Sequence, residues 1–275
     1  MTDKKVLFLD MDGTTLDDKH RISEENTQAL RRVAQAGHEV VIATGRTYSS
    51  AAYLRKHYGL DRIGCRYMIV CNGAAILDCE TGEFLFSRTL PLEHAYNLID
   101  AARREGVYLH TYASDKVLTE QDDENLAHYI SRTSMEVLIV PDLKAALKAP
   151  PYKMLGINVH EQKALCRFRD MLSGWSEDKV DMYFSCAEYL EFVPKGISKG
   201  AALRIFCERM DIPAKNTVAA GDENNDISMI KAAGVGCAVA NASENVKASA
   251  DYVTVRDHNH SAVAEIAERF MLNDG

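Results

Sequence analysis

The amino-acid sequence predicts an α/β fold with a Rossmann-like, doubly wound parallel sheet as its core and an inserted α+β cap domain. Near both ends of the 275-residue chain, short runs that are apolar on both faces alternate with helical stretches. Strands of this kind are typical of parallel sheets that helices cover on both sides. In the middle third this alternation gives way to a mixture of helices and amphipathic strands, which indicates a separate inserted domain.

The first half of the core sheet is predicted by three apolar runs and the helical segments between them. The runs cover residues 6–9, 38–45 and 67–74. Ser23 is placed to cap a helix that carries an apolar stripe and ends at Gly37. Residues 48–58 form a second helical stretch, so strands and helices alternate as a doubly wound sheet requires.

A turn at Thr81-Gly82 marks the start of the inserted domain, which we place at residues 83–187. Residues 84–90 predict a short strand within it, and Pro91 opens a helix. Two further short runs, over residues 108–114 and 116–120, are typical of a hairpin. The core domain then consists of residues 1–82 and 188–275.

The second half of the core is predicted by a return of the strand–helix alternation. It begins with an amphipathic helix over residues 198–210. The strands expected after it cover residues 217–222, 237–240 and 252–255, and the helices cover residues 225–234, 245–250 and 262–270. These elements are expected to complete the same sheet.

Composition and charge exclude several classes of protein. Hydrophobic residues make up 47% of the chain and charged residues 26%, which is ordinary for a globular domain. The apolar stretches are too short to cross a bilayer or to form a secretory signal. Seven cysteines without a CxxC pair favour reduced thiols in the cytoplasm over a zinc site. A net charge of −8 without a basic stripe disfavours nucleic acid as a partner. We therefore expect a cytoplasmic monomer or small homo-oligomer that binds neither nucleic acid nor membrane.

The segment Asp10-Met11-Asp12-Gly13-Thr14 follows the first apolar run directly. In open α/β sheets, ligands bind beyond the carboxyl ends of the strands, which is where this segment is expected to lie. Two carboxylates one residue apart, beside a glycine that permits a sharp turn, suit a hard cation and a phosphate together. We expect Asp10 to attack phosphorus and Asp12 to serve as general acid and base. The alternative is an acidic turn with solvated side chains.

Two other segments offer groups that hold a phosphate. Thr44-Gly45-Arg46 closes the second apolar run with a hydroxyl and backbone N–H groups, although a capped strand-to-helix turn explains it equally well. Lys199 lies in the first turn of a predicted helix, where the helix dipole disfavours a cation, so a nearby anion would account for it. The alternative is a surface lysine, and Lys195 offers the same charge four residues earlier.

The segment from Gly221 to Asp226 follows another apolar run and supplies a third group of oxygen ligands. Mg²⁺ prefers a few carboxylate oxygens, with water and substrate phosphate completing its shell. We expect Asp222 to meet this demand together with Asp10, and Asp226 to act through water or by orienting a neighbour. The alternative is a polar helix cap at Asn225 or Asp226.

Taken together, these motifs resemble those of the haloacid dehalogenase-like (HAD) phosphatases, and within them the Cof-type subfamily with a large α/β cap of type IIB. The matching segments are DMDGTTLD (10–17), ATGR (43–46), CNGA (71–74), SKG (198–200), GDENNDISMI (221–230) and VANASENVKASADYVT (239–254). They occur in the order and spacing of the family, with Thr15 where a leucine is usual. The resemblance implies a Mg²⁺-dependent phosphoric monoester hydrolase with a HAD-like catalytic core and a cap that governs substrate specificity.

The resemblance also implies roles for single residues. Asp10 is implied as the nucleophile and Asp12 as the acid and base, with Thr44 and Lys199 holding the transferring phosphoryl group. The residues implied in binding substrate and phosphate are Asp10, Thr44, Gly45, Arg46, Asn72, Lys199 and Asn225. Those implied at the metal are Asp10, Asp12 through its backbone carbonyl, Asp222 and, as outer support, Asp226.

Three functions compete at this point. The leading one is hydrolysis of phosphate monoesters of small metabolites, such as sugar phosphates or phosphorylated cofactors, through an aspartyl-phosphate. A phosphomutase of the phosphomannomutase type shares the first step but passes the phosphoryl group to a sugar hydroxyl. A non-catalytic binding protein on the same scaffold would have lost a catalytic side chain, and none is lost here. His258 and His260, which suggest a metal pair, are assigned no role.

Overall fold

The computed structural model describes residues 4–113, 116–133 and 135–272. The chain forms two compact units, of which the first, the core, consists of Met1–Ser87 and Ser198–Gly275. The second unit, the cap, consists of Arg88–Ile197. The core is thus assembled from both ends of the chain, and the cap is a single insertion between them.

The core contains an eight-stranded sheet with the strand order β14-β13-β12-β1-β2-β3-β4-β5. Neighbours from β14 to β3 are parallel, whereas β4 and β5 are added antiparallel. The N-terminal and C-terminal parts of the core are joined where β1 pairs with β12, with Val6 opposite Thr217. The strands are β1 (Val6–Leu9), β2 (Glu39–Ala43), β3 (Tyr67–Val70), β4 (Ala75–Asp78), β5 (Phe84–Ser87), β12 (Thr217–Gly221), β13 (Val235–Ala238) and β14 (Tyr252–Val253).

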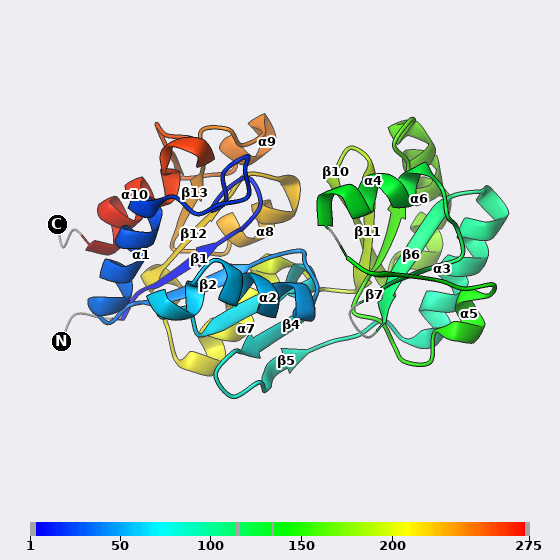
Figure 1. Ribbon diagram of the computed structural model, residues 1–275, viewed down its shortest axis with the longest axis horizontal. Coiled ribbons are helices and arrows are strands. Elements are labelled where there is room, and N and C mark those ends of the chain that lie inside the picture. The colour runs from blue at the N-terminus through cyan, green and yellow to red at the C-terminus, as the bar shows by residue number, and fades with distance from the viewer. Residues whose placement is uncertain (1–3, 114–115, 134, 273–275) are drawn as a thin grey trace. The chain divides into compact units, whose positions relative to one another are not determined.

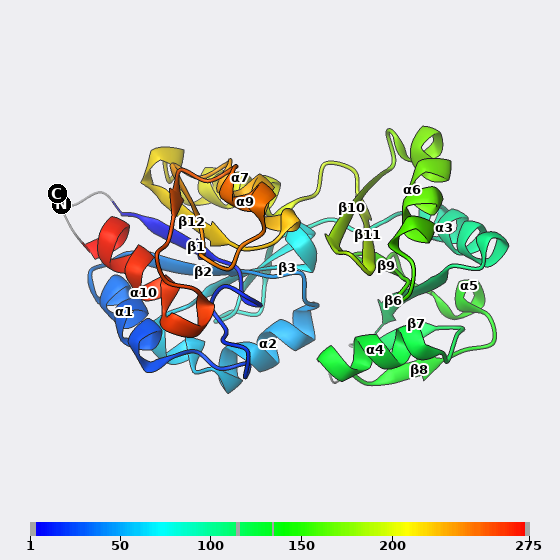
Figure 2. The same cartoon turned by 90° about the horizontal axis from the view of Figure 1, so that it is seen from above.

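Helices cover both faces of this sheet, which confirms the predicted doubly wound α/β fold (Figure 1). Figure 2 shows α1 (Glu24–Gln35), α2 (Tyr48–His57) and α10 (Ala262–Ile266) on one face and α7 (Lys199–Met210) on the other. Ser23 caps α1 as expected, since its side chain accepts a hydrogen bond from the Asn26 amide. On the α7 face, Phe206 packs edge-on against Phe8, with ring centroids 5.6 Å apart.

Shorter helical segments connect these elements. They are η1 (Leu60–Ile63), η2 (Cys71–Gly73), η3 (Ala214–Asn216), η4 (Asn224–Asp226), α8 (Ile227–Ile230), α9 (Glu244–Lys247), η5 (His258–His260) and the π-helix η6 (Ala267–Leu272). The helix predicted over residues 225–234 is therefore shorter and begins as a 3₁₀ turn. The one predicted over residues 262–270 changes from α to π geometry after Ile266.

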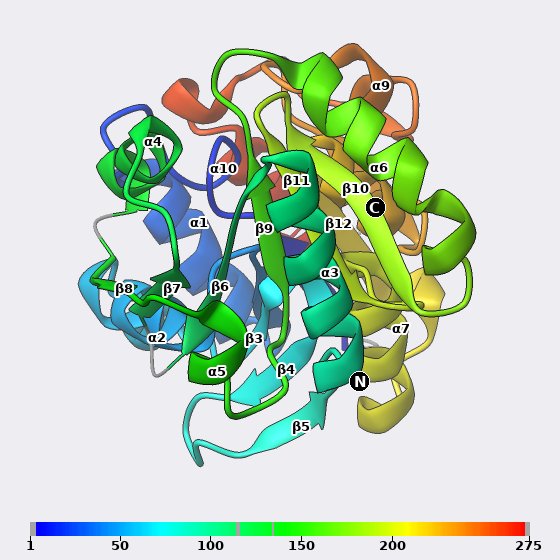
Figure 3. The same cartoon turned by 90° about the vertical axis from the view of Figure 1, so that its right-hand side faces the viewer.

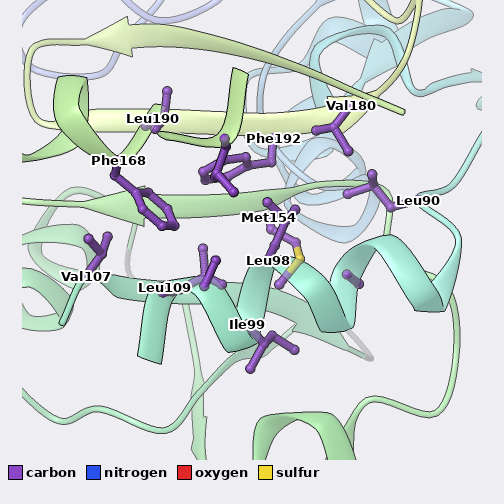
Figure 4. Close-up of a cluster of buried hydrophobic side chains, with 14 of the residues drawn as sticks. Leu90, Leu98, Ile99, Val107, Leu109, Met154, Phe168, Val180, Leu190 and Phe192 are labelled. Carbon is purple, nitrogen blue, oxygen red and sulfur yellow. The ribbon is translucent and has the colours of Figure 1, made fainter. Parts of the chain in front are cut away.

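The cap contains a six-stranded sheet with the order β10-β11-β9-β6-β7-β8. Neighbouring strands in this sheet are antiparallel, except that β7 and β8 are parallel to each other. Figure 3 shows α3 and α6 side by side on one face of this sheet, and Figure 4 shows the apolar side chains packed beneath them, among them Leu98, Phe168 and Phe192. The elements are α3 (Leu92–Glu105), β6 (Tyr108–Ala113), β7 (Lys116–Thr119), α4 (Glu124–Thr133), β8 (Val137–Ile139), α5 (Leu143–Ala146), β9 (Met154–Ile157), α6 (Gln162–Ser176), β10 (Val180–Cys186) and β11 (Tyr189–Pro194).

Strand pairing places the limits of the two units later in the chain than the sequence suggested. β5, which was expected in the inserted domain, pairs with β4 and so belongs to the core sheet. β11, which was expected to lead into the core, pairs with β9 and β10 in the cap. A strand belongs to the sheet that satisfies its backbone hydrogen bonds, and the limits at residues 82 and 187 are corrected accordingly to Ser87 and Ile197.

The cysteines are all free thiols, in agreement with their dispersed pattern. Burial raises the pKa of Cys65 to about 12, so this thiol stays protonated. None of the helices in the described part of the chain combines the length and the apolar character needed to cross a membrane.

Candidate active site

The candidate site lies in the core unit, at the carboxyl ends of three neighbouring strands. Asp10 directly follows β1, Thr44 follows β2 and Asp222 follows β12. These strands are adjacent in the order β12-β1-β2, and the Asp10 amide donates to the Ala220 carbonyl at 3.0 Å. Three segments that are far apart in the sequence therefore present their side chains at the same end of the sheet.

Three buried carboxylates form the centre of the site. Asp10, Asp222 and Asp226 each offer one oxygen, and these oxygens all lie within 4.8 Å of one another. Burial raises the pKa of Asp10 to about 7, although the Lys199 ammonium opposes this shift. Burial, together with the charges of Asp10 and Asp226, raises the pKa of Asp222 well above its usual range. Concentrated negative charge of this kind favours the binding of a cation.

Lys199 supplies one cation to this cluster from the first turn of α7. Its buried Nζ donates to Asp10 Oδ1 at 2.5 Å and to Asp226 Oδ1 at 2.6 Å. Burial alone would lower the pKa of Lys199, but the two carboxylates raise it above its usual value. The unfavourable position at a helix N-terminus is thus offset by two ion pairs. Lys195, the alternative candidate, pairs with Asp181 in the cap at 2.8 Å.

Asp226 and Asp222 differ in how their oxygens are used. Asp226 Oδ2 accepts hydrogen bonds from the amides of Asp222 and Glu223, both at 3.1 Å, while Oδ1 accepts from Lys199. Asp222 Oδ1 accepts from the Thr14 hydroxyl at 2.8 Å. Asp226 therefore fixes the backbone at Asp222 and Glu223 and holds the Lys199 ammonium. Thr14 was not singled out from the sequence, although a hydroxyl two residues after Asp12 was a usable signal.

Asp12 and Arg46 form a second charged group beside the triad. The Arg46 guanidinium donates from Nε to Asp12 Oδ2 at 2.9 Å and from Nη2 to Oδ1 at 2.5 Å, a bidentate pair. The Asp12 side chain is 48% exposed, so it faces solvent where the triad does not. Thr44 is buried, and its hydroxyl accepts from the Arg46 amide at 3.1 Å. Because the hydroxyl oxygen is the acceptor in this bond, its O–H group can donate to a ligand.

Two asparagine amides lie next to this group. Asn225 Nδ2 donates to Asn72 Oδ1 at 3.1 Å, and the Asn72 backbone amide donates to the Thr44 carbonyl at 3.1 Å. Within the described residues, the buried atoms Asn72 Nδ2 and Asn225 Oδ1 have no hydrogen-bond partner. Unpaired buried polar atoms are rare, and they favour a polar ligand here. A side chain at Gly45 would crowd this amide, because its Cβ would lie 2.9 Å from Asn72 Oδ1.

Two glycines allow the first turn of α7 to sit close to its neighbours. A Cβ on Gly73 would overlap the Ser198 carbonyl, and a Cβ on Gly200 would overlap the Ser228 carbonyl. The turn that carries Lys199 is therefore held between η2 and α8 by direct backbone packing. Both glycines fall in motifs noted in the sequence, but their packing role depends on contacts between distant segments.

Comparison of the sequence with known proteins shows which family the chain resembles. The sequence matches the family model of haloacid dehalogenase-like hydrolases over residues 7–266. Phosphatase YwpJ of Bacillus subtilis (strain 168) is 29% identical, over 93% of this chain and 96% of that protein. The HMP-PP phosphatase of Yersinia enterocolitica is 30% identical, over 88% of this chain and 86% of that protein.

Solved structures agree with these relatives. A haloacid dehalogenase-like hydrolase from Bacteroides thetaiotaomicron matches with a TM-score of 0.86 and 30% identity, over 97% of this chain and 99% of that one. The subclass IIB sugar phosphatase BT4131 matches with a TM-score of 0.83 at 22% identity, over 97% of this chain and 99% of that one. At this identity, the likeness to BT4131 shows a shared fold.

Proposed function

Because the chain belongs to the haloacid dehalogenase-like hydrolase family, as a Cof-type phosphatase, we propose that it hydrolyses phosphate monoesters of small metabolites through an aspartyl-phosphate on Asp10. The observation that carries this proposal is the buried Asp10 carboxylate, which follows β1 and lies 2.5 Å from the Lys199 ammonium. The name of one similar protein, an HMP-PP phosphatase, supports a small phosphorylated substrate. We propose sugar phosphates or phosphorylated cofactors as the substrate class.

The reaction has two steps in which the same two carboxylates act. First, an oxygen of Asp10 bonds to phosphorus while the ester oxygen leaves with a proton from Asp12. Water then attacks phosphorus, gives a proton to Asp12 and releases Asp10. The phosphate of the substrate competes with Asp12 for the Arg46 guanidinium, and this competition frees Asp12 for proton transfer.

The remaining side chains hold the phosphoryl group. The Lys199 ammonium neutralises charge on the phosphoryl oxygens, which is the main contribution of a protein to phosphoryl transfer. The Thr44 hydroxyl donates to one of these oxygens. Asn72 and Asn225 complete the phosphate contacts with their amides, while Gly45 and Arg46 supply backbone and guanidinium donors.

The acidic triad also fits Mg²⁺, a hard cation that takes carboxylate and carbonyl oxygens. One ammonium offsets only part of the negative charge of the three carboxylates, so a divalent ion would bring the cluster close to neutrality. Asp10, Asp222 and the Asp12 carbonyl would hold the ion, and Asp226 would support it from outside. Mg²⁺ bound there supplies further neutralisation of the phosphoryl oxygens.

Phosphate release from a panel of phosphorylated metabolites, assayed with Mg²⁺, tests the proposal. Asp10→Asn should abolish release while circular dichroism shows an intact fold, because the amide cannot form the aspartyl-phosphate. Asp211→Asn, the same change at the exposed C-cap of α7, is the control and should be active. Substantial activity in Asp10→Asn refutes the nucleophile. Conversion of a hexose 1-phosphate to its 6-phosphate would instead identify a phosphomutase.

A further inference from the structure

The loop that follows Asp10 is tied to the C-terminal part of the chain by Asn241. Asn241 Nδ2 donates to the Gly13 carbonyl at 2.8 Å, and Asn241 Oδ1 accepts from the His258 amide at 3.0 Å. Both ends of one carboxamide are thus used to connect two backbone segments. No role for Asn241 follows from the steps proposed above.

The segment that holds Asn241 is itself fixed to the same loop. The His258 side chain lies 2.8 Å from Asp18 Oδ1, and Asn259 exchanges two hydrogen bonds with Asp18, from Nδ2 to Oδ2 at 3.0 Å and from the Asp18 amide to Oδ1 at 3.1 Å. Asp257 caps η5 by accepting from the Asn259 amide at 2.9 Å. His258, one of the two histidines without an assigned role, therefore helps to anchor the segment that holds Asn241.

The carbonyls of Asp10, Met11 and Gly13 all accept hydrogen bonds, which distinguishes them from the Asp12 carbonyl between them. The Asp10 carbonyl accepts from the Thr15 hydroxyl at 2.5 Å, and the Met11 carbonyl accepts from the amides of Thr15 and Leu16 at 3.0 and 2.9 Å. The Gly13 carbonyl accepts from Asn241. Among the described residues, none of the hydrogen bonds found ends on the Asp12 carbonyl, which is the oxygen assigned above to Mg²⁺.

Gly13 needs an external restraint because glycine has the widest backbone freedom of any residue. It adopts a φ of +79°, in the left-handed region. Rotation about this residue would move the two peptides on either side of it, and the preceding one carries the Asp12 carbonyl. A hydrogen bond to the Gly13 carbonyl limits that rotation.

We propose that Asn241 is a positioning residue for the Mg²⁺ site, acting through the Gly13 carbonyl on the Asp12 carbonyl. This inference rests on the proposed function, since it assumes that the acidic triad binds Mg²⁺. The side chain of Asn241 is exposed, and its two hydrogen bonds join it to the backbone of Gly13 and of His258. Its effect is therefore expected on metal affinity, with little effect on the stability of the fold.

Isothermal titration calorimetry of Mg²⁺ into the substrate-free 275-residue chain tests the proposal. Asn241→Ala should bind Mg²⁺ about tenfold more weakly than the natural protein, the lower end of what loss of an outer-shell partner costs. Thermal unfolding without Mg²⁺ should be unchanged. Asn245→Ala, the same change at an exposed position of α9, is the control and should bind normally. Asn241→Ser replaces the alanine variant if that variant does not fold.

The outcomes separate this inference from the proposed function. If the natural protein does not bind Mg²⁺, the metal assignment itself fails. If it binds Mg²⁺ and Asn241→Ala binds equally well, only the role of Asn241 is overturned. Equal weakening in Asn245→Ala, or a lower unfolding temperature of Asn241→Ala without Mg²⁺, would assign Asn241 a general structural role and overturn the inference as well.

Discussion

Replacing Gly13 with alanine tests whether close packing of the loop after Asp10 sets the geometry of the acidic triad. Gly13 has a φ of +79°, and a Cβ there would overlap Asp222 Oδ2. Asp222 has little room to yield, because its other oxygen accepts a hydrogen bond from Thr14 at 2.8 Å. Either the carboxylate or the loop must therefore move.

Two separate costs follow from this substitution. An alanine in the left-handed region costs about 1–2 kcal/mol of folding free energy. A displacement of about 1 Å in a catalytic group costs on the order of 100-fold in rate, which corresponds to about 2.7 kcal/mol of transition-state stabilisation. The first cost falls on stability, and the second falls on kcat/KM and on Mg²⁺ affinity.

Gly82 provides the matched control. Its φ is +77°, and a Cβ there would meet nothing within 4 Å. Gly82→Ala therefore carries the same backbone strain without the collision. Urea denaturation should show a similar loss of about 1–2 kcal/mol in both variants, whereas phosphate release should fall about 100-fold in Gly13→Ala alone.

Two results would refute this reasoning. If Gly13→Ala keeps more than about a third of the natural kcat/KM, far from the expected 100-fold loss, the loop tolerates the extra carbon and the packing does not set the site. If Gly82→Ala loses activity to the same degree, the loss reflects backbone strain at a distance and not the position of Asp222.

Lys199→Met should abolish phosphate release and lower the free energy of unfolding by about 3 kcal/mol, because it leaves two buried carboxylates without their cation; unchanged stability in urea would contradict this. Lys153→Ala in the cap should cost a similar ~3 kcal/mol, because buried Glu191, 3.1 Å from the ammonium, loses its partner. The double variant Lys153→Met/Glu191→Leu should recover most of that loss, and failure to recover would show that packing, not charge, is responsible. Chelation of Mg²⁺ with EDTA should stop phosphate release, and added Mg²⁺ should restore it; activity that persists in EDTA would exclude metal dependence.

Local patterns in the sequence were sufficient for the types of several core elements and for the positions of Asp10, Thr44 and Asp222 at strand ends. The apolar runs before Asp10, Thr44 and Asp222 predicted buried strands, and polar residues after such strands are expected at one end of a parallel sheet. Ser23 was identified as a helix cap from its position alone, and the structure agrees. These predictions succeed because each depends on neighbours in the chain.

Pairings between distant segments were decided only by the tertiary structure. The sequence predicted the β5 strand but placed it, and the residues of β11, in the wrong unit, since a strand's own residues do not specify its partner. The tertiary structure also decided the positions of Asn241 and Thr14 and the close packing at Gly13 and Gly73, because each depends on contacts between distant segments. Local sequence determines which conformation a segment adopts, whereas its place in the site depends on burial and hydrogen bonds that form only once the chain has folded.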